Sequence, residues 1–216
     1  MLNKEAGFQS IAPGLLEQVK KAVGILRSGG IVAYPTDTVY GLGSDVYNDE
    51  AVNKVFLAKN RPLNMPLPVL IADVSQLTGL AGTFPPYART LMGKYWPGGL
   101  TIVFNKAAAF ASLVLADSSK IAIRMPGHPV ALMLIKELGR PISGTSANLH
   151  DHASTLTAGE VEKQLGGGVD FIMDAGRCRG GQESTIIDIT VNPPAILRSG
   201  IIAENELMAV YSRQGN

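Results

Sequence analysis

The sequence has 216 residues, of which 46% are hydrophobic and 17% are charged, and its formal net charge is +1. A chain of this length can bury a full core, so we expect one domain over residues 1–216. The near-neutral charge argues against a protein that holds nucleic acid or acidic membranes by bulk electrostatic attraction, although it is compatible with a local basic patch.

The first predicted elements are a helix over residues 15–26 and a buried strand over residues 31–34. Apolar residues recur with helical spacing in the former, and the latter is a short apolar run rich in β-favouring residues. Polar residues 36–38 follow the strand, and Gly41 and Gly43 come next. This order predicts a loop at the end of a sheet strand, where ligands often bind, although an ordinary tight turn explains the same residues.

The rest of the chain alternates between helical and strand patterns. Helices are predicted at residues 49–58, 86–95, 128–138, 157–165 and 203–211, and strands at residues 66–72, 100–104, 121–125, 171–173, 185–190 and 195–198. Asp49 is a predicted N-cap, and Thr157 with Glu160 fits a capping box. Because strands and helices interleave irregularly, we predict a single α/β domain of α+β-like character, with a twisted mixed parallel and antiparallel sheet flanked by helices.

The candidates for chemistry are hydroxyl-rich segments and isolated cations. The sequence contains no standard phosphate-loop, dinucleotide-binding, nucleophile-elbow or metalloprotease motif. Hydroxyls instead follow short apolar strands at residues 36–38, 143–148 and 183–185, and cations end predicted elements at Lys59, Arg61, Arg124 and Arg198. Hydroxyls coordinate phosphate or carboxylate oxygens, and arginine clamps them bidentately. A set of this kind without a nucleophile fits nucleotidyl transfer by positioning and charge neutralisation.

Each of these residues, taken alone, more often has a structural role than a role in binding or catalysis. Lys59 and Arg61, for example, suit the C-terminus of a helix through its dipole. His150 and His152 lie two apart with few other ligands nearby, so we predict no metal site. His128 suits the start of a helix, where a polar side chain can accept a backbone hydrogen bond.

Cys178 is the only cysteine, which excludes an intrachain disulfide and agrees with a reducing cytoplasm. It lies between two arginines that could lower its pKa, but an ordinary loop cysteine is the favoured interpretation. No apolar run approaches the length that spans a bilayer, and residues 1–5 do not lead into the apolar core of a signal peptide. We therefore expect a cytoplasmic protein with no membrane partner.

Seven segments together resemble the YrdC-like family, the threonylcarbamoyl-adenylate synthases. They are Tyr34-Pro-Thr-Asp-Thr-Val-Tyr-Gly-Leu-Gly43, Lys59-x-Arg61-Pro62, Trp96-Pro97-Gly98, Ile123-Arg124-Met-Pro, Ser146-Ala147-Asn148, Glu183-Ser184-Thr185-Ile186 and Leu197-Arg198. They occur in the family's order, so the resemblance covers nearly the whole chain. It implies the short, single-domain form of the YrdC-like fold, with a core over about residues 11–200 and a terminal helix over about residues 203–211.

The resemblance also implies an activity and a site. Family members combine L-threonine, bicarbonate and ATP into threonylcarbamoyl-adenylate and pyrophosphate, for the t6A modification of tRNA at adenosine 37. The implied catalytic residues are Lys59, Arg61 and Arg124. The implied threonine-binding residues are Thr38, Arg124, Gly144 and Ser184, and the implied nucleotide-binding residues are Lys59, Arg61, Ser146, Asn148, Ser154 and Arg198. Mg²⁺ is expected with the triphosphate, other t6A-pathway proteins are expected partners, and tRNA is expected to bind only weakly.

The chain departs from the family pattern after the lysine-arginine segment. Some members have Asn-Pro-Leu-x-x-His there, whereas this chain has Met65 and Leu70 at the asparagine and histidine positions. The corresponding contacts to nucleotide and threonine are therefore absent or supplied elsewhere. Two alternatives stay open, namely a YrdC-like protein that binds nucleotide or structured RNA without this chemistry, and a carbamoyl-transferring enzyme with another acceptor.

Overall fold

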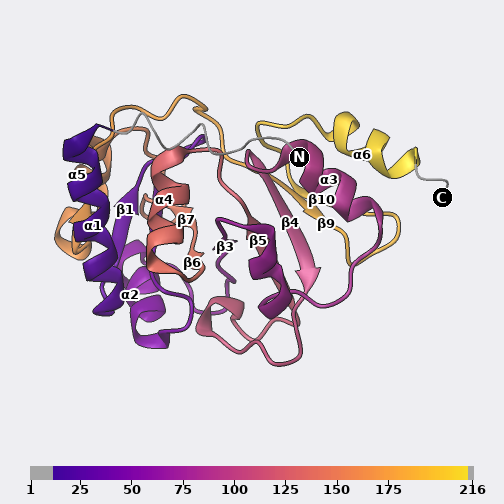
Figure 1. The fold of residues 1–216 in the computed structure, drawn as a ribbon, viewed down its shortest axis with the longest axis horizontal. Coiled ribbons are helices and arrows are strands. Elements are labelled where there is room, and N and C mark those ends of the chain that lie inside the picture. Colours follow the sequence, from indigo (N-terminus) through magenta and orange to yellow (C-terminus); the bar gives the residue numbers. More distant parts are fainter. Residues whose placement is uncertain (1–11, 214–216) are drawn as a thin grey trace.

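The strands form two sheets that lie side by side along the long axis of the molecule (Figure 1). The structure, a computed structural model, describes residues 12–213. The predicted core boundary at residue 11 and the expectation for residues 1–5 lie outside the described residues. The strands are β1 (Val32–Tyr34), β2 (Gly41–Gly43), β3 (Val69–Leu70), β4 (Leu100–Asn105), β5 (Lys120–Arg124), β6 (Ile142–Ser143), β7 (Thr145–Ser146), β8 (Phe171–Ile172), β9 (Thr185–Asp188) and β10 (Ala195–Arg198).

The helices cover the outer faces of the two sheets. The α-helices are α1 (Pro13–Arg27), α2 (Asp49–Lys59), α3 (Tyr87–Tyr95), α4 (Pro129–Leu138), α5 (Ala158–Leu165) and α6 (Glu204–Ser212). Short 3₁₀ turns lie at Val74–Gly79, Leu113–Leu115 and Gly166–Gly168. Helices α1, α2 and α5 lie around the four-stranded sheet at the left of Figure 1, whereas α3 and α6 lie beside the six-stranded sheet at the right.

The predicted α/β class with mixed strand pairing is confirmed, but the strands divide into two sheets where one was predicted. The strand order is β7-β2-β1-β8 in one sheet and β10-β9-β4-β5-β3-β6 in the other. The chain passes between the sheets at Gly144, which follows β6 and precedes β7. A Cβ atom on Gly144 would lie 2.7 Å from Cδ2 of Leu70, so only glycine fits this crossing.

Residues 41–43 form strand β2 and not the predicted loop. They pair antiparallel with β1, and both glycines lie against the ring of Tyr34. The Tyr34 side chain is fully buried, and its hydroxyl donates to the carbonyl of Ser143 at 3.1 Å. A Cβ atom on Gly41 would lie 2.8 Å from the Tyr34 ring. The two glycines therefore make room for a buried aromatic ring inside a sheet, which a turn prediction does not anticipate.

Two further predictions are corrected by local hydrogen bonding. The strand predicted at residues 66–72 is reduced to Val69 and Leu70, because Pro66 and Pro68 have no N–H to donate to a ladder. The capping box of α5 is only half formed. Thr157 accepts from the N–H of Glu160 at 3.2 Å, but the Glu160 carboxylate accepts from the N–H of Leu156 and not from that of Thr157.

The start of α2 also differs by one residue from the prediction. Asn48, and not Asp49, is the N-cap, since its side chain accepts from the N–H of Ala51 at 3.1 Å. Asp49 lies in the first turn, where its charge still suits the helix dipole.

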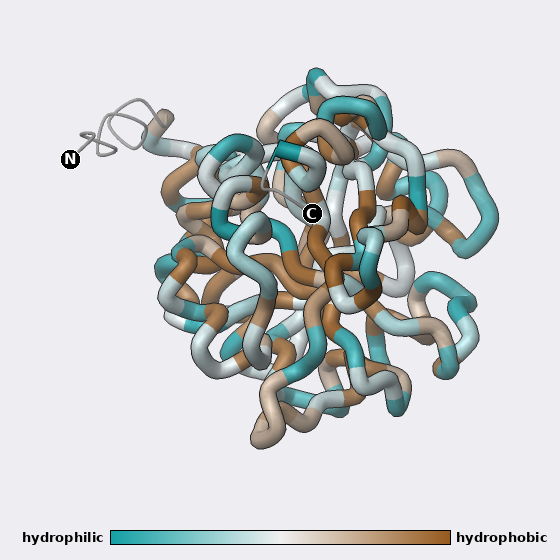
Figure 2. Tube along the Cα trace, turned by 90° about the vertical axis from the view of Figure 1, so that its right-hand side faces the viewer, coloured by the Kyte–Doolittle hydropathy of each residue, from teal (hydrophilic) through white to brown (hydrophobic). Residues whose placement is uncertain are grey.

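The core is apolar and runs through the middle of the molecule (Figure 2). A second apolar cluster joins α1 to α4, where Val19, Val23 and Leu26 meet Leu134 and Leu138. Each of these buried aliphatic side chains contributes about 1.5–3 kcal/mol to stability. In residues 12–213, no helix has the length and apolarity needed to cross a membrane.

Replacing Gly43 by alanine should lower the free energy of unfolding by about 1–3 kcal/mol, because the new methyl group would collide with the Ser143 carbonyl and the Tyr34 ring. The matched control is Gly24→Ala on α1, where a Cβ atom meets nothing within 4 Å. Alanine there should stabilise by up to about 1 kcal/mol, since it favours the helix. Urea unfolding of both variants measures the difference, and equal effects would contradict the packing described for β2.

Candidate active site

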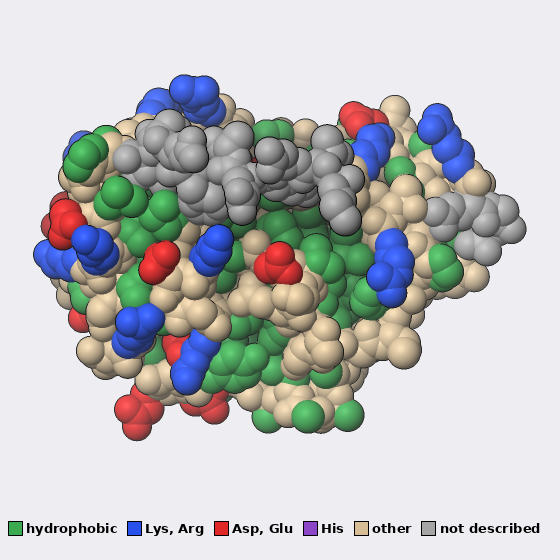
Figure 3. All heavy atoms as spheres, in the orientation of Figure 1, with side chains coloured by type: hydrophobic (Ala, Val, Ile, Leu, Met, Phe, Trp, Pro, Cys, Tyr) green, Lys and Arg blue, Asp and Glu red, His purple; other side chains and the backbone are tan. Residues whose placement is uncertain are grey.

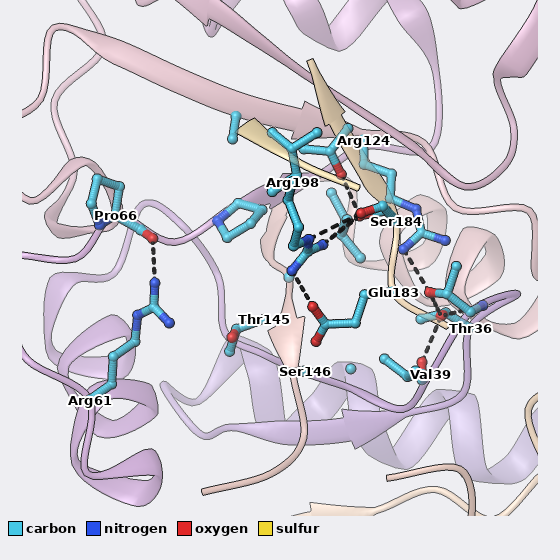
Figure 4. Close-up of a pocket in the computed structure, with 18 of the residues that line it drawn as sticks. Thr36, Val39, Arg61, Pro66, Arg124, Thr145, Ser146, Glu183, Ser184 and Arg198 are labelled. Carbon is cyan, nitrogen blue, oxygen red and sulfur yellow. Dashed lines mark hydrogen bonds and ion pairs between the residues drawn. The ribbon is translucent and has the colours of Figure 1, made fainter. Parts of the chain in front are cut away.

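A cavity of about 690 Å³ lies where the two sheets meet. The four-stranded sheet contributes Tyr34, Gly41 and Ser146 to its wall, and the six-stranded sheet contributes Thr101 and Arg124. Loops that follow β1 and precede β9 complete it. Figure 4 shows Arg61 beside Pro66 at one end of the view, with Arg198, Ser184 and Arg124 at the other.

The structure brings nearly all the sequence-predicted site residues into this cavity. Those that line it are Thr38, Lys59, Arg61, Arg124, Gly144, Ser146, Asn148, Ser184 and Arg198. Ser154 is not part of the lining, but its hydroxyl donates to Oε1 of Glu183 at 2.8 Å, and Glu183 does line the cavity. Residues from six separate segments of the chain therefore converge on one space.

Arg124 is a buried cation in the wall of the cavity, with 7% of its surface exposed. Its Nε donates to the carbonyl of Gly98 at 2.9 Å, and its Nη1 donates to Oγ1 of Thr38 at 2.9 Å. Nη2 forms an ion pair with Oδ1 of Asp37 at 2.6 Å. Burial lowers the pKa of Arg124, and the Asp37 charge opposes this. The guanidinium remains charged, because arginine does not deprotonate in proteins.

Lys59 ends α2 and is almost completely buried, with 2% of its surface exposed. Its Nζ donates to the backbone carbonyls of Ser146 and Asn148, which lie beyond β6. The ammonium therefore serves another segment and not the C-terminus of its own helix. Burial, and to a smaller degree the nearby Arg61, lower the pKa of Lys59 to about 8, while the charge of Glu183 opposes the shift.

Arg61 and Arg198 are held in different ways. Within the described part of the chain, the Arg61 guanidinium donates only inside its own loop, to the carbonyls of Met65 at 3.2 Å and Pro66 at 3.0 Å. The Arg198 guanidinium donates to the carbonyl and hydroxyl of Ser184, each at 2.9 Å from Nη2, and Nη1 pairs with Glu183. Both charges face the cavity.

Asn148 carries an open hydrogen-bond acceptor. Its Nδ2 donates to the carbonyls of Leu149 at 2.8 Å and His152 at 2.7 Å, which fixes the orientation of the amide. Its Oδ1 is buried and has no hydrogen-bond partner within residues 12–213. A buried acceptor without a partner is costly, so this atom is suited to a donor that a ligand brings.

Sequence reasoning missed two acids in the cavity region, Asp37 and Glu183. Each acid stands next to a predicted site residue in the sequence. Asp37, however, pairs with Arg124, which is 87 residues away, and Glu183 pairs with Arg198, which is 15 residues away. His150 and His152 also line the cavity. Among the residues that the structure describes, no three His, Cys, Asp or Glu side chains lie together as metal ligands would.

The remaining candidates behave as simple structural residues. His128 caps α4, since its Nδ1 accepts from the N–H of Val130 at 3.3 Å, which confirms the predicted role at a helix start. Cys178 is buried, and this raises the pKa of its thiol, so the lowered pKa considered for it is wrong. Leu70, at the departure from the family pattern, lines the cavity beside Gly144, whereas Met65 is partly exposed and offers Arg61 its carbonyl.

Comparison with known proteins identifies the family. The family model Sua5/YciO/YrdC, described as "Telomere recombination", matches residues 24–200. The chain belongs to the Sua5/YciO/YrdC family. Among its relatives is the threonylcarbamoyl-AMP synthase of Bacillus subtilis strain 168, which is 44% identical over 194 residues, covering 89% of this chain and 56% of the relative.

Two solved structures of Sua5/YciO/YrdC proteins show how closely the fold is shared. The crystal structure of Pyrococcus abyssi Sua5 complexed with L-threonine has a TM-score of 0.87 and 39% identity, and covers 90% of this chain and 57% of that one. Escherichia coli YciO has a TM-score of 0.78 and 28% identity, with 87% and 91% covered. The chain thus spans little more than half the length of the Bacillus and Pyrococcus relatives.

The lowered pKa of Lys59 should make stability depend on pH. Its pKa is about 8 in the folded state against 10.5 for an unperturbed lysine, so the unfolded state binds more protons between these values and stability rises with pH. We expect a gain of about 2 kcal/mol between about pH 7 and 9.5 relative to a Lys59→Met variant. Urea unfolding at several pH values measures this difference in slope, and parallel slopes would contradict it. The variant retains Tyr40, whose pKa is raised to about 12, so tyrosine ionisation cancels in the comparison.

Proposed function

We propose that the chain makes threonylcarbamoyl-adenylate and pyrophosphate from L-threonine, bicarbonate and ATP, for the t6A modification of tRNA at adenosine 37. The observation that carries the proposal is one cavity lined by the buried Arg124 and by three further cations, Lys59, Arg61 and Arg198, in a chain 39% identical to a Sua5 that was solved with L-threonine. An amino acid and a polyphosphate can therefore meet in it.

The amino-acid half would be built from Thr38, Arg124, Gly144 and Ser184. Three of the five guanidinium N–H groups of Arg124 donate to Gly98, Asp37 and Thr38, which leaves two for a carboxylate. The Ser184 hydroxyl lies 2.8 Å from Oγ1 of Thr101 and accepts from Arg198, so it is already oriented toward the cavity. Gly144 would contribute its backbone to this half, because Leu70 occupies the space that a side chain on Gly144 would need.

The nucleotide half would be built from Lys59, Arg61, Ser146, Asn148, Ser154 and Arg198. Lys59 supplies a point charge, and the two arginines supply planar donors for phosphate oxygens. The open Oδ1 of Asn148 would accept from a hydroxyl or amino group of the nucleotide or from an ordered water. Mg²⁺ would arrive with the triphosphate, whose oxygens and waters supply most of its ligands.

The chemistry then needs positioning and charge neutralisation. Bicarbonate takes up a proton and loses water to give CO2, and the neutral threonine amine bonds to the CO2 carbon and releases a proton to form a carbamate. A carbamate oxygen bonds to the α-phosphorus, and the bond between that phosphorus and the α,β-bridging oxygen breaks, so that pyrophosphate leaves with the bridging oxygen. Lys59, Arg61 and Arg198 would stabilise the charge that passes to pyrophosphate. Arg124 would hold the threonine carboxylate or the carbamate. No protein nucleophile is required.

The cellular setting is part of the same proposal. We expect one YrdC-like domain acting in the cytoplasm that passes its product to other proteins of the t6A pathway. Direct binding to tRNA should be weak, because the chain is nearly neutral, and acidic and basic side chains are mixed on the face displayed in Figure 3.

Pyrophosphate release from ATP by the purified protein should require both L-threonine and bicarbonate. The physical reason is that the attacking oxygen belongs to a carbamate made from both. A coupled pyrophosphate assay with each substrate omitted in turn measures this. Release that is indifferent to threonine would favour a carbamoyl-transferring enzyme with another acceptor, and absence of release with retained ATP binding would favour a nucleotide-binding module.

The two arginines should act on different halves of the substrate. Removing a desolvated bidentate arginine contact costs about 2–5 kcal/mol of binding free energy. Arg124→Ala should therefore weaken threonine binding far more than ATP binding, and Arg61→Ala should do the reverse. Arg124→Ala should also lower the melting temperature, because it leaves Asp37 without its ion pair, whereas Arg61 holds only its own loop.

Calorimetric titration of both variants with each ligand decides this assignment. The control is Arg89→Ala on α3, an exposed arginine outside the cavity lining, which should change neither affinity. Equal losses of ATP and threonine binding in both variants would contradict the division of the cavity into two halves.

A further inference from the structure

Glu183 places a carboxylate inside the cation-lined part of the cavity. It lies in the loop just before β9 and lines the cavity with 31% of its side chain exposed. Its Oε1 accepts from the Ser154 hydroxyl at 2.8 Å, and its Oε2 pairs with Nη1 of Arg198. Figure 4 shows this carboxylate directly beside the Arg198 guanidinium. Glu183 thus holds two residues that the proposed function assigns to the nucleotide.

The surroundings of Glu183 are strongly cationic. Its charge acts to raise the pKa of Lys59 and of Arg61, against the larger effects of burial and of their neighbouring arginines. Arg61 and Arg198 are in turn close enough to repel each other, which lowers the pKa of Arg61. Asp151 is a second carboxylate that acts on Arg61. The cavity lining as a whole has five Lys and Arg side chains and three Asp and Glu side chains, so it carries a net charge of two. An anion with two or more charges is the complement of this arrangement.

Arg198 does not need Glu183 to stay in place. Its Nε donates to the Ser184 carbonyl at 3.1 Å, and its Nη2 donates to that carbonyl and to the Ser184 hydroxyl, each at 2.9 Å. These bonds fix one edge of the guanidinium to the backbone, while Glu183 contacts only Nη1 at the other edge. If Glu183 moved away, the freed edge of Arg198 would remain in position for another anion.

We propose that Glu183 is an internal counter-anion of this cavity, which a polyphosphate must displace from Arg198 and Ser154 in order to bind. The carboxylate neutralises the cations in the empty protein, and it repels any phosphate group that approaches the same donors. It therefore opposes binding of every polyphosphate and determines how much negative charge a ligand needs in order to enter. The assignment of the phosphates to this end rests on the proposed function, but the displacement itself depends only on charge.

The test is the affinity of Glu183→Gln for inorganic pyrophosphate, measured by calorimetric titration without threonine or bicarbonate. Glutamine keeps the shape of the side chain and an oxygen for Ser154, but it removes the charge. We expect the variant to bind pyrophosphate about tenfold more tightly than the wild type, because the competing anion is gone. Adenosine, which has no charge, should bind equally to both proteins.

Two matched controls isolate the charge at this position. Glu183→Asp keeps the charge and should show no such gain, and Glu137→Gln removes an exposed charge on α4, outside the cavity lining, and should leave the affinity unchanged. Unchanged pyrophosphate affinity in Glu183→Gln would overturn the proposal and leave Glu183 a structural partner of Arg198. Weaker binding, with or without Mg²⁺, would also overturn it, because Glu183 would then help to hold the ligand or its cation.

A second measurement needs no variant. In a crystal structure of the wild-type protein with pyrophosphate, the Glu183 carboxylate should have left Nη1 of Arg198, and a phosphate oxygen should take its place. An intact Glu183–Arg198 pair beside the bound ligand would refute the proposal. Neither measurement includes threonine or turnover, so its result is independent of whether the chain makes threonylcarbamoyl-adenylate.

Discussion

The structure depends most on the Arg124 guanidinium, which joins the two sheets. Arg124 ends β5 of the six-stranded sheet, whereas Asp37 and Thr38 follow β1 of the four-stranded sheet. Its third protein contact, the Gly98 carbonyl, lies just before β4. A buried cation is tolerated only when its donors are satisfied, so the loop after β1 is held in one position by this arginine. The wall of the cavity is thereby fixed before any ligand binds.

The other cations of the cavity are held in a way that keeps their charge available. Lys59, Arg61 and Arg198 all donate to backbone carbonyls, which orient them without neutralising them. Among the described residues, Arg198 is the one of these three that has an acidic partner, since its Nη1 pairs with Glu183. Such preorganised charge suits a reaction whose main demand is stabilisation of phosphate oxygens, and it explains why the site functions without a protein nucleophile in the proposed mechanism.

Much of the fold could be predicted from the sequence, because helices such as α1 and strands such as β4 carry clear apolar patterns. Strand β2 could not, since Gly-Leu-Gly has no such pattern and its glycines are explained by the Tyr34 ring across the sheet. The residues of the cavity were found by resemblance, but their contacts were not. Lys59 suits a helix end in sequence, and only the tertiary structure reveals that it reaches carbonyls 87 and 89 residues away.

A double-mutant cycle on Arg124 and Asp37 tests most directly whether this ion pair joins the sheets. The free energy of unfolding would be measured in urea for the wild type, Arg124→Met, Asp37→Asn and the double variant. If the pair links the sheets, each single change should destabilise the protein and the double change should cost clearly less than their sum, with a coupling free energy of about 2 kcal/mol or more. Effects that add to within about 0.5 kcal/mol would contradict the account, because the two side chains would then be energetically independent.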